Sequence, residues 1–348
     1  MRNVDVPVLS RIDRFLFSVE WEDHFQGVHQ VTLPKITLDH FPILLRVGEV
    51  SRGRRPFKFE NMWLEASGFD DLVKAVWDVQ NVSGSSSFIL AKKLNLLKTK
   101  LKQWNREVFG HLEFKMGSLV DKVKRLDEKE QQQSLSWADR FERLGVKKEL
   151  SMVRKSIDIF WRQRAKQQWI EDGDRNTKFF HQVANRRRRF NAIHQIKVDG
   201  ESYADAASAK NAIVKFYENL YHEDQSSRFF FDGIAFASIS PEDASDLVKD
   251  FTEDGVWKAI SELGIEKAPG PDGFNIAFFQ HCWPIIKGEI MGFFGDFHKK
   301  GVFEKSLNAT FITLIPKVAG ADDIKSFRPI SLVGSVYKIL AKVLASRS

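Results

Sequence analysis

A run of turn-forming residues, Pro269-Gly-Pro-Asp-Gly273, constrains this chain more than any other stretch. Its prolines fix the backbone φ angle and its glycines can adopt positive φ, so the run predicts a stiff double turn. Gly270, Asp272 and Gly273 are therefore expected to be structural residues. Asp272 can cap the helix that follows, because a carboxylate accepts N–H groups at a helix start. A long aromatic helix is predicted after the turn.

Two short apolar runs come after this helix. Residues 309–316 are β-branched and apolar and end at a proline, which predicts a strand. Lys317 lies at the end of that strand, and Arg328 begins the second run beside a proline. Two cations held at neighbouring strand ends would suit a polyphosphate. They could equally be solvated loop cations, and composition alone leaves both interpretations open.

The motifs of this region resemble a known family. The series APGPDGF, LIPK, FRPISL and YKILAKVLASR resembles the fingers region of reverse transcriptases from LINE-type (non-LTR) retrotransposons, most closely those of plants. The resemblance covers about residues 240–348. It implies that Lys317 and Arg328 lie near the incoming nucleotide. It also implies that the intact enzyme is an RNA-directed DNA polymerase that uses Mg²⁺.

The catalytic part of that enzyme is missing from these residues. Nucleotide addition needs divalent metal ions held by carboxylates. In the family, those aspartates follow the fingers motifs, two of them in a Tyr-x-Asp-Asp turn. The segments Tyr203-Ala-Asp-Ala206 and Gly320-Ala-Asp-Asp323 do not fit, because one lacks the second aspartate and the other lacks the tyrosine. We therefore expect no metal site, no bound cofactor and no polymerase activity in this chain.

Composition limits the compartment and the class of fold. The sequence has 43% hydrophobic residues, enough for a core, and Cys282 is its single cysteine, which excludes a disulfide framework and any cysteine-based zinc site. The first fifteen residues carry five charged side chains, unlike a signal peptide. No apolar run approaches the roughly 18 residues of a membrane span. We expect a soluble intracellular protein, nuclear or cytoplasmic, that does not associate with membranes.

The positive charge is concentrated in the middle of the chain. Residues 86–200 hold 27 Lys and Arg against 14 Asp and Glu, whereas the whole chain has a net charge of +7. Leucines recur every three or four residues from Leu90 to Leu101, which predicts an amphipathic helix, and Gly110 and Gly117 are expected to interrupt the helices. The segment is either a helical hairpin whose lysines confer solubility or an arm that lies along RNA or DNA.

The end of this segment is its most basic part. A phrase from Trp169 to His181 leads into four consecutive arginines, and the expected nucleic-acid contacts are Lys178, Arg186, Arg187, Arg188 and Arg189. A calcium loop is excluded here because Thr177 and Val183 replace the required glycine and glutamate. The arginines could instead be a nuclear-localisation signal or a solvated helix end, although nearby aromatic residues favour nucleic acid.

The N-terminus carries a second resemblance. Residues 9–18 and 39–47 read as strands, and an Asp-His pair at a strand start is either a proton-transfer or metal site or a simple turn. The pattern resembles the C-terminal end of the endonuclease/exonuclease/phosphatase fold. That resemblance implies that His40 acts at the scissile phosphate, Asp13 orients it and Asp39 is an acidic partner. About 47 residues cannot close a two-sheet sandwich, so we expect no nuclease activity.

Together these patterns predict a mostly α fold with small β elements: a long helical arm and an incomplete α+β fingers region. The expected segments are an incomplete endonuclease-like part (1–48), a connector (49–85), a basic helical arm (86–190), a hairpin and helix (191–239), and truncated fingers (240–348). The expected partners are RNA and DNA. A rival interpretation is a non-enzymatic, basic helical protein that binds nucleic acid or another protein. The oligomeric state is not predicted.

Overall fold

The computed structural model describes residues 14–16, 18, 21, 25, 28–32, 43–46, 56–79, 82–165, 177–193, 195–223, 233 and 238–347. The chain divides into two units, Met1–Arg55 and Pro56–Ser348. The expected endonuclease-like residues Asp13, Asp39 and His40 lie outside the described residues, so their roles stay predictions. Described helices dominate and the described strands are few and short, which confirms a mostly α fold with small β elements. No described helix is both long and apolar enough for a membrane span.

The N-terminal unit contains one antiparallel pair of strands. β1 (His29–Thr32) pairs with β2 (Ile43–Arg46) in a register that joins His29 to Arg46. β2 lies within the predicted strand at 39–47. The described residues of the other predicted strand, 9–18, are not in a strand, and β1 lies between the two predicted strands.

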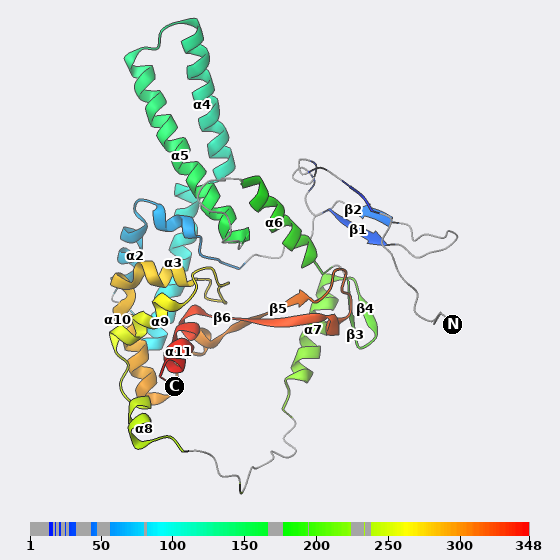
Figure 1. Cartoon of the computed structure of the whole chain (residues 1–348), viewed down its shortest axis with the longest axis vertical. Coiled ribbons are helices and arrows are strands. Elements are labelled where there is room, and N and C mark those ends of the chain that lie inside the picture. The colour runs from blue at the N-terminus through cyan, green and yellow to red at the C-terminus, as the bar shows by residue number, and fades with distance from the viewer. Residues whose placement is uncertain are drawn as a thin grey trace, which may run out of the picture. The chain divides into compact units, whose positions relative to one another are not determined.

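A helical core organises the larger unit (Figure 1). Its elements are η1 (Asn61–Glu65), α2 (Phe69–Trp77), α3 (Ser86–Val108), α9 (Glu253–Glu262), α10 (Ile276–Lys300), η2 (Lys305–Asn308) and α11 (Ser335–Ala345). Phenylalanines of α10 and the predicted leucine stripe of α3, Leu90 to Leu101, are buried in one cluster. Phe59 and Trp63, from the expected connector, are buried in the same cluster.

Only part of the predicted basic arm (86–190) is a helical hairpin, because its first helix, α3, belongs to the core. α4 (Leu112–Gln132) and α5 (Trp137–Ala165) run side by side in opposite directions (Figure 1), and α6 (Thr177–Phe190) packs against α5. Gly110 adopts a φ of 57° just past the end of α3, as expected for an interruption. The prediction for Gly117 was wrong: it lies inside α4, where its missing side chain does not break the hydrogen-bond ladder.

A smaller cluster is built from hairpins. β3 (Ile196–Val198) and β4 (Glu201–Tyr203) are joined by Asp199 and Gly200, both at positive φ, as the Asp-Gly pair predicts. α7 (Ala206–Leu220) packs against them, and α8 (Pro241–Leu247) follows Ser240, whose side chain accepts the Asp243 N–H as the helix cap. The strands β5 (Thr310–Pro316) and β6 (Phe327–Val333), with η3 (Ile324–Ser326) between them, form the long hairpin of the C-terminal region.

Candidate functional site: the β5–β6 hairpin and the basic helices

The double turn is held between two backbone segments. A Cβ atom on Gly270 would lie 2.5 Å from the Gly334 nitrogen and from the Val333 carbonyl carbon. Gly273 has a φ of 80°, and a Cβ there would lie 2.5 Å from the Phe57 carbonyl oxygen. The Phe59 N–H donates to the Gly273 carbonyl at 2.8 Å. Both glycines are therefore needed because the backbone approaches closely on both sides of the turn.

Asp272 caps a different helix from the one predicted. Its carboxylate accepts the Ser335 N–H at 2.7 Å, at the start of α11, while Asn275 caps α10 by accepting the Phe278 N–H. The prediction that Asp272 caps the following helix was wrong, because the turn folds back onto the β6–α11 junction. Burial raises the pKa of Asp272 despite the hydrogen bonds and nearby lysines that favour its charged form.

The turn thus fixes where β6 ends, and the β5–β6 register places the two expected phosphate-binding cations. Arg328 pairs with Ile315, and the Lys317 N–H donates to the Ser326 carbonyl at 2.9 Å, one residue past β5. Paired residues of an antiparallel ladder share a face and side chains alternate along each strand. Lys317 and Arg328 are therefore diagonal neighbours on one face, with backbones roughly 7–8 Å apart.

The surroundings of these cations are open. Both residues are exposed, and no ion pair joins Arg328 to another described residue. The Lys317 ammonium donates to the Lys325 carbonyl at 2.6 Å, which holds it against the hairpin turn. The opposite face of the hairpin, with Leu314 and Phe327, packs into the cluster of β3 and α7. The face that carries the cations is thus free to meet a ligand.

The carboxylates of the hairpin turn do not form a metal site. Asp322 pairs with Lys197 at 2.8 Å, and Asp323 accepts the Lys325 N–H at 2.8 Å as the cap of η3. Within the described part of the chain, no three His, Cys, Asp or Glu side chains are arranged to hold a metal ion. The described residues therefore do not fit the Mg²⁺ site that the family resemblance implies.

The arginines of α6 point in several directions. Arg187 donates to the Ala165 carbonyl at the end of α5, while Arg186 and Arg188 are exposed. Neighbours on a helix are about 100° apart, so Arg186 and Arg188 leave α6 on roughly opposite sides. Lys178 and Arg189 lie on α6, but their side chains are outside the described atoms. One arginine thus attaches α6 to α5, and the run is not a single flat patch.

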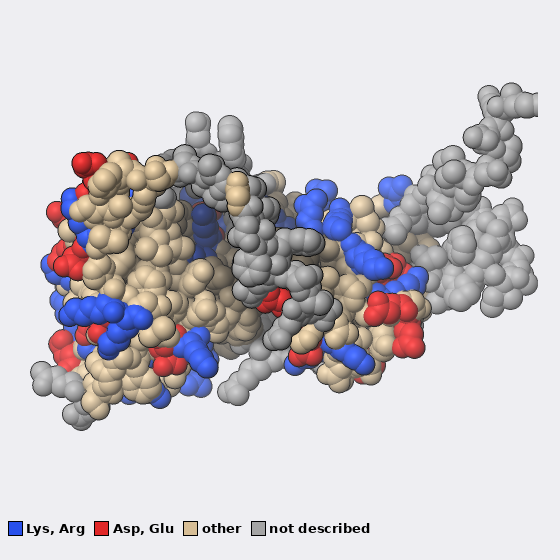
Figure 2. Space-filling view, turned by 90° about the horizontal axis from the view of Figure 1, so that it is seen from below, with Lys and Arg blue, Asp and Glu red and all other residues tan. Residues whose placement is uncertain are grey.

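Ion pairs neutralise much of the charge on the arm. Across the α4–α5 interface, Lys129 pairs with Asp139 at 2.7 Å, Lys115 with Glu149 at 3.0 Å, and Arg143 with two acids of α4. Figure 2 shows the face at the end away from the α4–α5 hairpin, and there too Lys and Arg side chains lie among Asp and Glu side chains and uncharged areas. A count of charges along the chain misses this pairing, because partners ten or more residues apart meet only when the hairpin closes.

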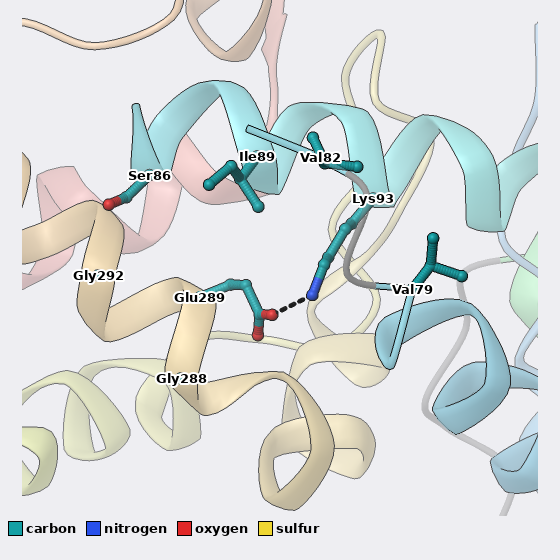
Figure 3. Close-up of a pocket in the computed structure, with 8 residues that line it drawn as sticks. All are labelled: Val79, Val82, Ser86, Ile89, Lys93, Gly288, Glu289 and Gly292. Carbon is teal, nitrogen blue, oxygen red and sulfur yellow. Dashed lines mark hydrogen bonds and ion pairs between the residues drawn. The ribbon is translucent and has the colours of Figure 1, made fainter. Parts of the chain in front are cut away.

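A hollow of about 400 Å³ lies between α3 and α10 (Figure 3). Gly288 and Gly292 form part of its wall, and Lys93 and Glu289 meet in an ion pair at its edge. Lys93 also donates to the Trp77 carbonyl, and the Trp77 indole N–H donates to Glu289, each at 2.6 Å. Every member of this network has a partner within the protein, so the network joins α2, α3 and α10 and is structural.

A comparison with known proteins identifies a transposon protein that is similar to this chain. The chain is similar to the "Transposon TX1 uncharacterized 149 kDa protein" of Xenopus laevis, with 26% identity over 356 residues. The similarity covers 97% of this chain and 26% of that protein, so the chain spans about a quarter of the relative's length. No family model matches the chain. Along almost its whole length, therefore, the chain is related to one segment of a transposon protein.

Proposed function

We propose that this chain is a segment of a non-LTR retrotransposon polyprotein that includes the fingers region of a reverse transcriptase. The similarity to a transposon protein supports this context. The observation that carries the proposal is the pairing of β5 with β6, which sets two exposed cations, Lys317 and Arg328, side by side on one open face. An ammonium and a guanidinium at this spacing suit the phosphate oxygens of a nucleoside triphosphate.

The hairpin would bind and orient the triphosphate without transferring it. Arg328 would contact two phosphate oxygens through its planar fork, and Lys317 would add a point charge beside it. The β3–α7 cluster supports the other face of the hairpin and keeps the two cations at a fixed spacing. Transfer of the nucleotide also needs carboxylate-held metal ions, which the described residues do not provide. These residues alone are therefore proposed to bind nucleotide and not to polymerise it.

Nucleotide binding tests the proposal directly. Titration of the purified chain with a fluorescent deoxynucleoside triphosphate should give saturable binding that weakens with added salt. Replacing Lys317 and Arg328 by alanine should weaken it at least about tenfold per cation, because hydrogen bonds to charged groups are strong. Lys325→Ala is the matched control: it removes an exposed cation from the same hairpin turn but keeps the carbonyl that holds Lys317. Equal binding by the double variant and the control would refute the clamp.

Primer extension tests the proposed lack of activity. On an RNA template with Mg²⁺, the 348 residues should yield no DNA product, and synthesis by the purified chain would contradict the proposal. Sequencing the gene beyond codon 348 would show whether a Tyr-x-Asp-Asp frame continues. Such a frame would support the origin in a longer polymerase.

A second candidate function is nucleic-acid binding without catalysis. The exposure of Arg186 and Arg188 on α6 favours it. Replacing residues 186–189 by alanine should weaken binding to RNA and DNA and reduce its dependence on salt. A chain that binds oligonucleotides but no triphosphate would favour this function over the first. Whether it acts in the nucleus or the cytoplasm stays a prediction.

A further inference from the structure

The outer face of α5 carries an exposed apolar stripe close to the α4–α5 turn. Trp137, Phe141 and Leu144 are 79%, 67% and 69% exposed. Their spacing of four and three residues puts them on one side of the helix. The rings of Trp137 and Phe141 lie 5.6 Å apart with planes only 15° from parallel. The two nearly parallel, stacked rings form an aromatic pair that is open to solvent.

Packing of the hairpin does not explain this stripe. The α5 residues that are buried within the arm are Val146, Leu150, Val153 and Ile157. At 100° per residue, Trp137 and Leu144 fall on the opposite side of α5 from these core positions. Exposed contiguous apolar surface is unfavourable in water and marks sites where a partner binds. The stripe is therefore available to a ligand.

Charge is segregated around the stripe. Between Trp137 and Arg154, the acids of α5 are Asp139, Glu142 and Glu149, and helical geometry puts all three on the half of the helix that carries the core residues. Asp139 and Glu149 are also neutralised by lysines of α4.

Three exposed cations of the same stretch flank the stripe, whereas Arg143 lies on the core side and is paired with two acids of α4. Arg140, Lys147 and Lys148 are exposed beside the stripe, and within the described residues none of them has an acidic partner. The face is thus aromatic and cationic, without a carboxylate, over about 17 Å of helix.

We propose that this face of α5 binds single-stranded nucleic acid. Bases would stack on the exposed rings of Trp137 and Phe141, and phosphates would contact Arg140, Lys147 and Lys148. Planar rings with neighbouring cations are how proteins hold single strands without reading their sequence. A duplex keeps its bases stacked inside and would meet only the cations. This site rests on the proposed function, because a retrotransposon polyprotein handles RNA and DNA. Its residues are nevertheless remote in sequence from Lys317 and Arg328.

Fluorescence anisotropy with a labelled 15-nucleotide oligo(U) and a DNA duplex of equal length tests this site. The single strand should bind more tightly than the duplex. The double variant Trp137→Ala/Phe141→Ala should bind the single strand about 10- to 100-fold more weakly and the duplex almost unchanged, because only base stacking is lost. The conservative variant Trp137→Phe should largely retain binding to the single strand, because it keeps an aromatic ring. Lys147→Ala/Lys148→Ala should lower the slope of log affinity against log salt by about two.

Matched controls come from α4. Phe114 is an aromatic residue of similar exposure, at 81%, so Phe114→Ala should leave binding unchanged, as should Lys122→Ala. Circular dichroism should show wild-type helix content in every variant, since the replaced side chains are exposed. Lys317→Ala/Arg328→Ala should retain oligo(U) binding, so failure of the nucleotide clamp is distinguishable from failure of this site. Wild-type affinity of Trp137→Ala/Phe141→Ala for oligo(U) would overturn the proposal, and would leave a protein partner as the better explanation of the stripe.

Discussion

Alanine in place of Gly270 should strongly destabilise the protein. The added Cβ would lie 2.5 Å from two backbone atoms of residues 333 and 334 and 2.6 Å from a third. Ordinary contacts begin about 1 Å farther out, and backbone atoms cannot rotate away as a side chain can. Overpacking of this kind costs about 1–3 kcal/mol, and the rigid neighbours put Gly270→Ala at about 3 kcal/mol.

Three other glycines separate this steric cost from backbone strain. Gly273 combines positive φ with a close approach, whereas Gly301 has a φ of 66° and open space around its Cβ position. Gly295 lies inside α10 with open space and no positive φ. Gly301→Ala should therefore cost about 1–2 kcal/mol through strain alone. Gly273→Ala should cost about the sum of both effects. Gly295→Ala should stabilise α10 by about 1 kcal/mol.

Urea unfolding followed by circular dichroism measures all four variants. From highest to lowest, the urea midpoints should be those of Gly295→Ala, wild type, Gly301→Ala, Gly270→Ala and Gly273→Ala. The slope of unfolding free energy against urea concentration should not change. If Gly270→Ala unfolds within about 0.5 kcal/mol of the wild type, the range of ordinary surface substitutions, the turn does not pack against the β6–α11 junction. A lower slope of unfolding free energy against urea concentration, with an unchanged midpoint, would mean that unfolding is no longer two-state.

Three further predictions concern charged side chains. Because the folded pKa of Asp272 is raised, its charge destabilises the fold increasingly as pH rises above about 4. Asp272→Asn should therefore gain stability relative to the wild type between pH 4 and neutrality, and a pH-independent difference between their urea midpoints would contradict this. Asp272→Ala should lose about 1 kcal/mol because it removes the cap of α11. Hydrogen bonds from Lys129 and Ser136 lower the pKa of Asp139 to about 2, so the stability that Asp139 contributes is present above about pH 4 and lost as pH falls toward 2. When the melting temperature is measured against pH, Asp139→Asn should flatten the curve over this range. An unaltered curve would argue against the pairing of Asp139 with Lys129. Lys93→Met should lower the free energy of unfolding in urea by about 2 kcal/mol, because Glu289 would lose its partner beside a hollow that water can enter. Glu289→Gln should cost less, since it keeps an acceptor for the Trp77 indole. Equal free energies of unfolding for Lys93→Met and the wild type would show that the ion pair contributes nothing to stability.

Local patterns decided much of the secondary structure before any fold was known. The leucine repeat of α3 appears as predicted. The Asp199-Gly200 turn and the cap at Ser240 likewise depend only on residues within a few positions. Gly117 shows the limit of such reasoning. A glycine weakens a helix by about 1 kcal/mol at most, which the packing of α4 on α5 outweighs.

Sequence by itself determined which residues have the chemistry for a site: the cations Lys317 and Arg328, the basic middle segment and the stiff turn at Gly270. Tertiary structure alone decided what these residues meet. Asp272 caps α11, 63 residues away, and Arg187 binds the end of α5. Strand pairing sets Lys317 beside Arg328, and hairpin closure sorts the charges of α5 into a paired face and an open one. Such contacts join residues distant along the chain, and no local pattern specifies them because their energy exists only once both partners are folded.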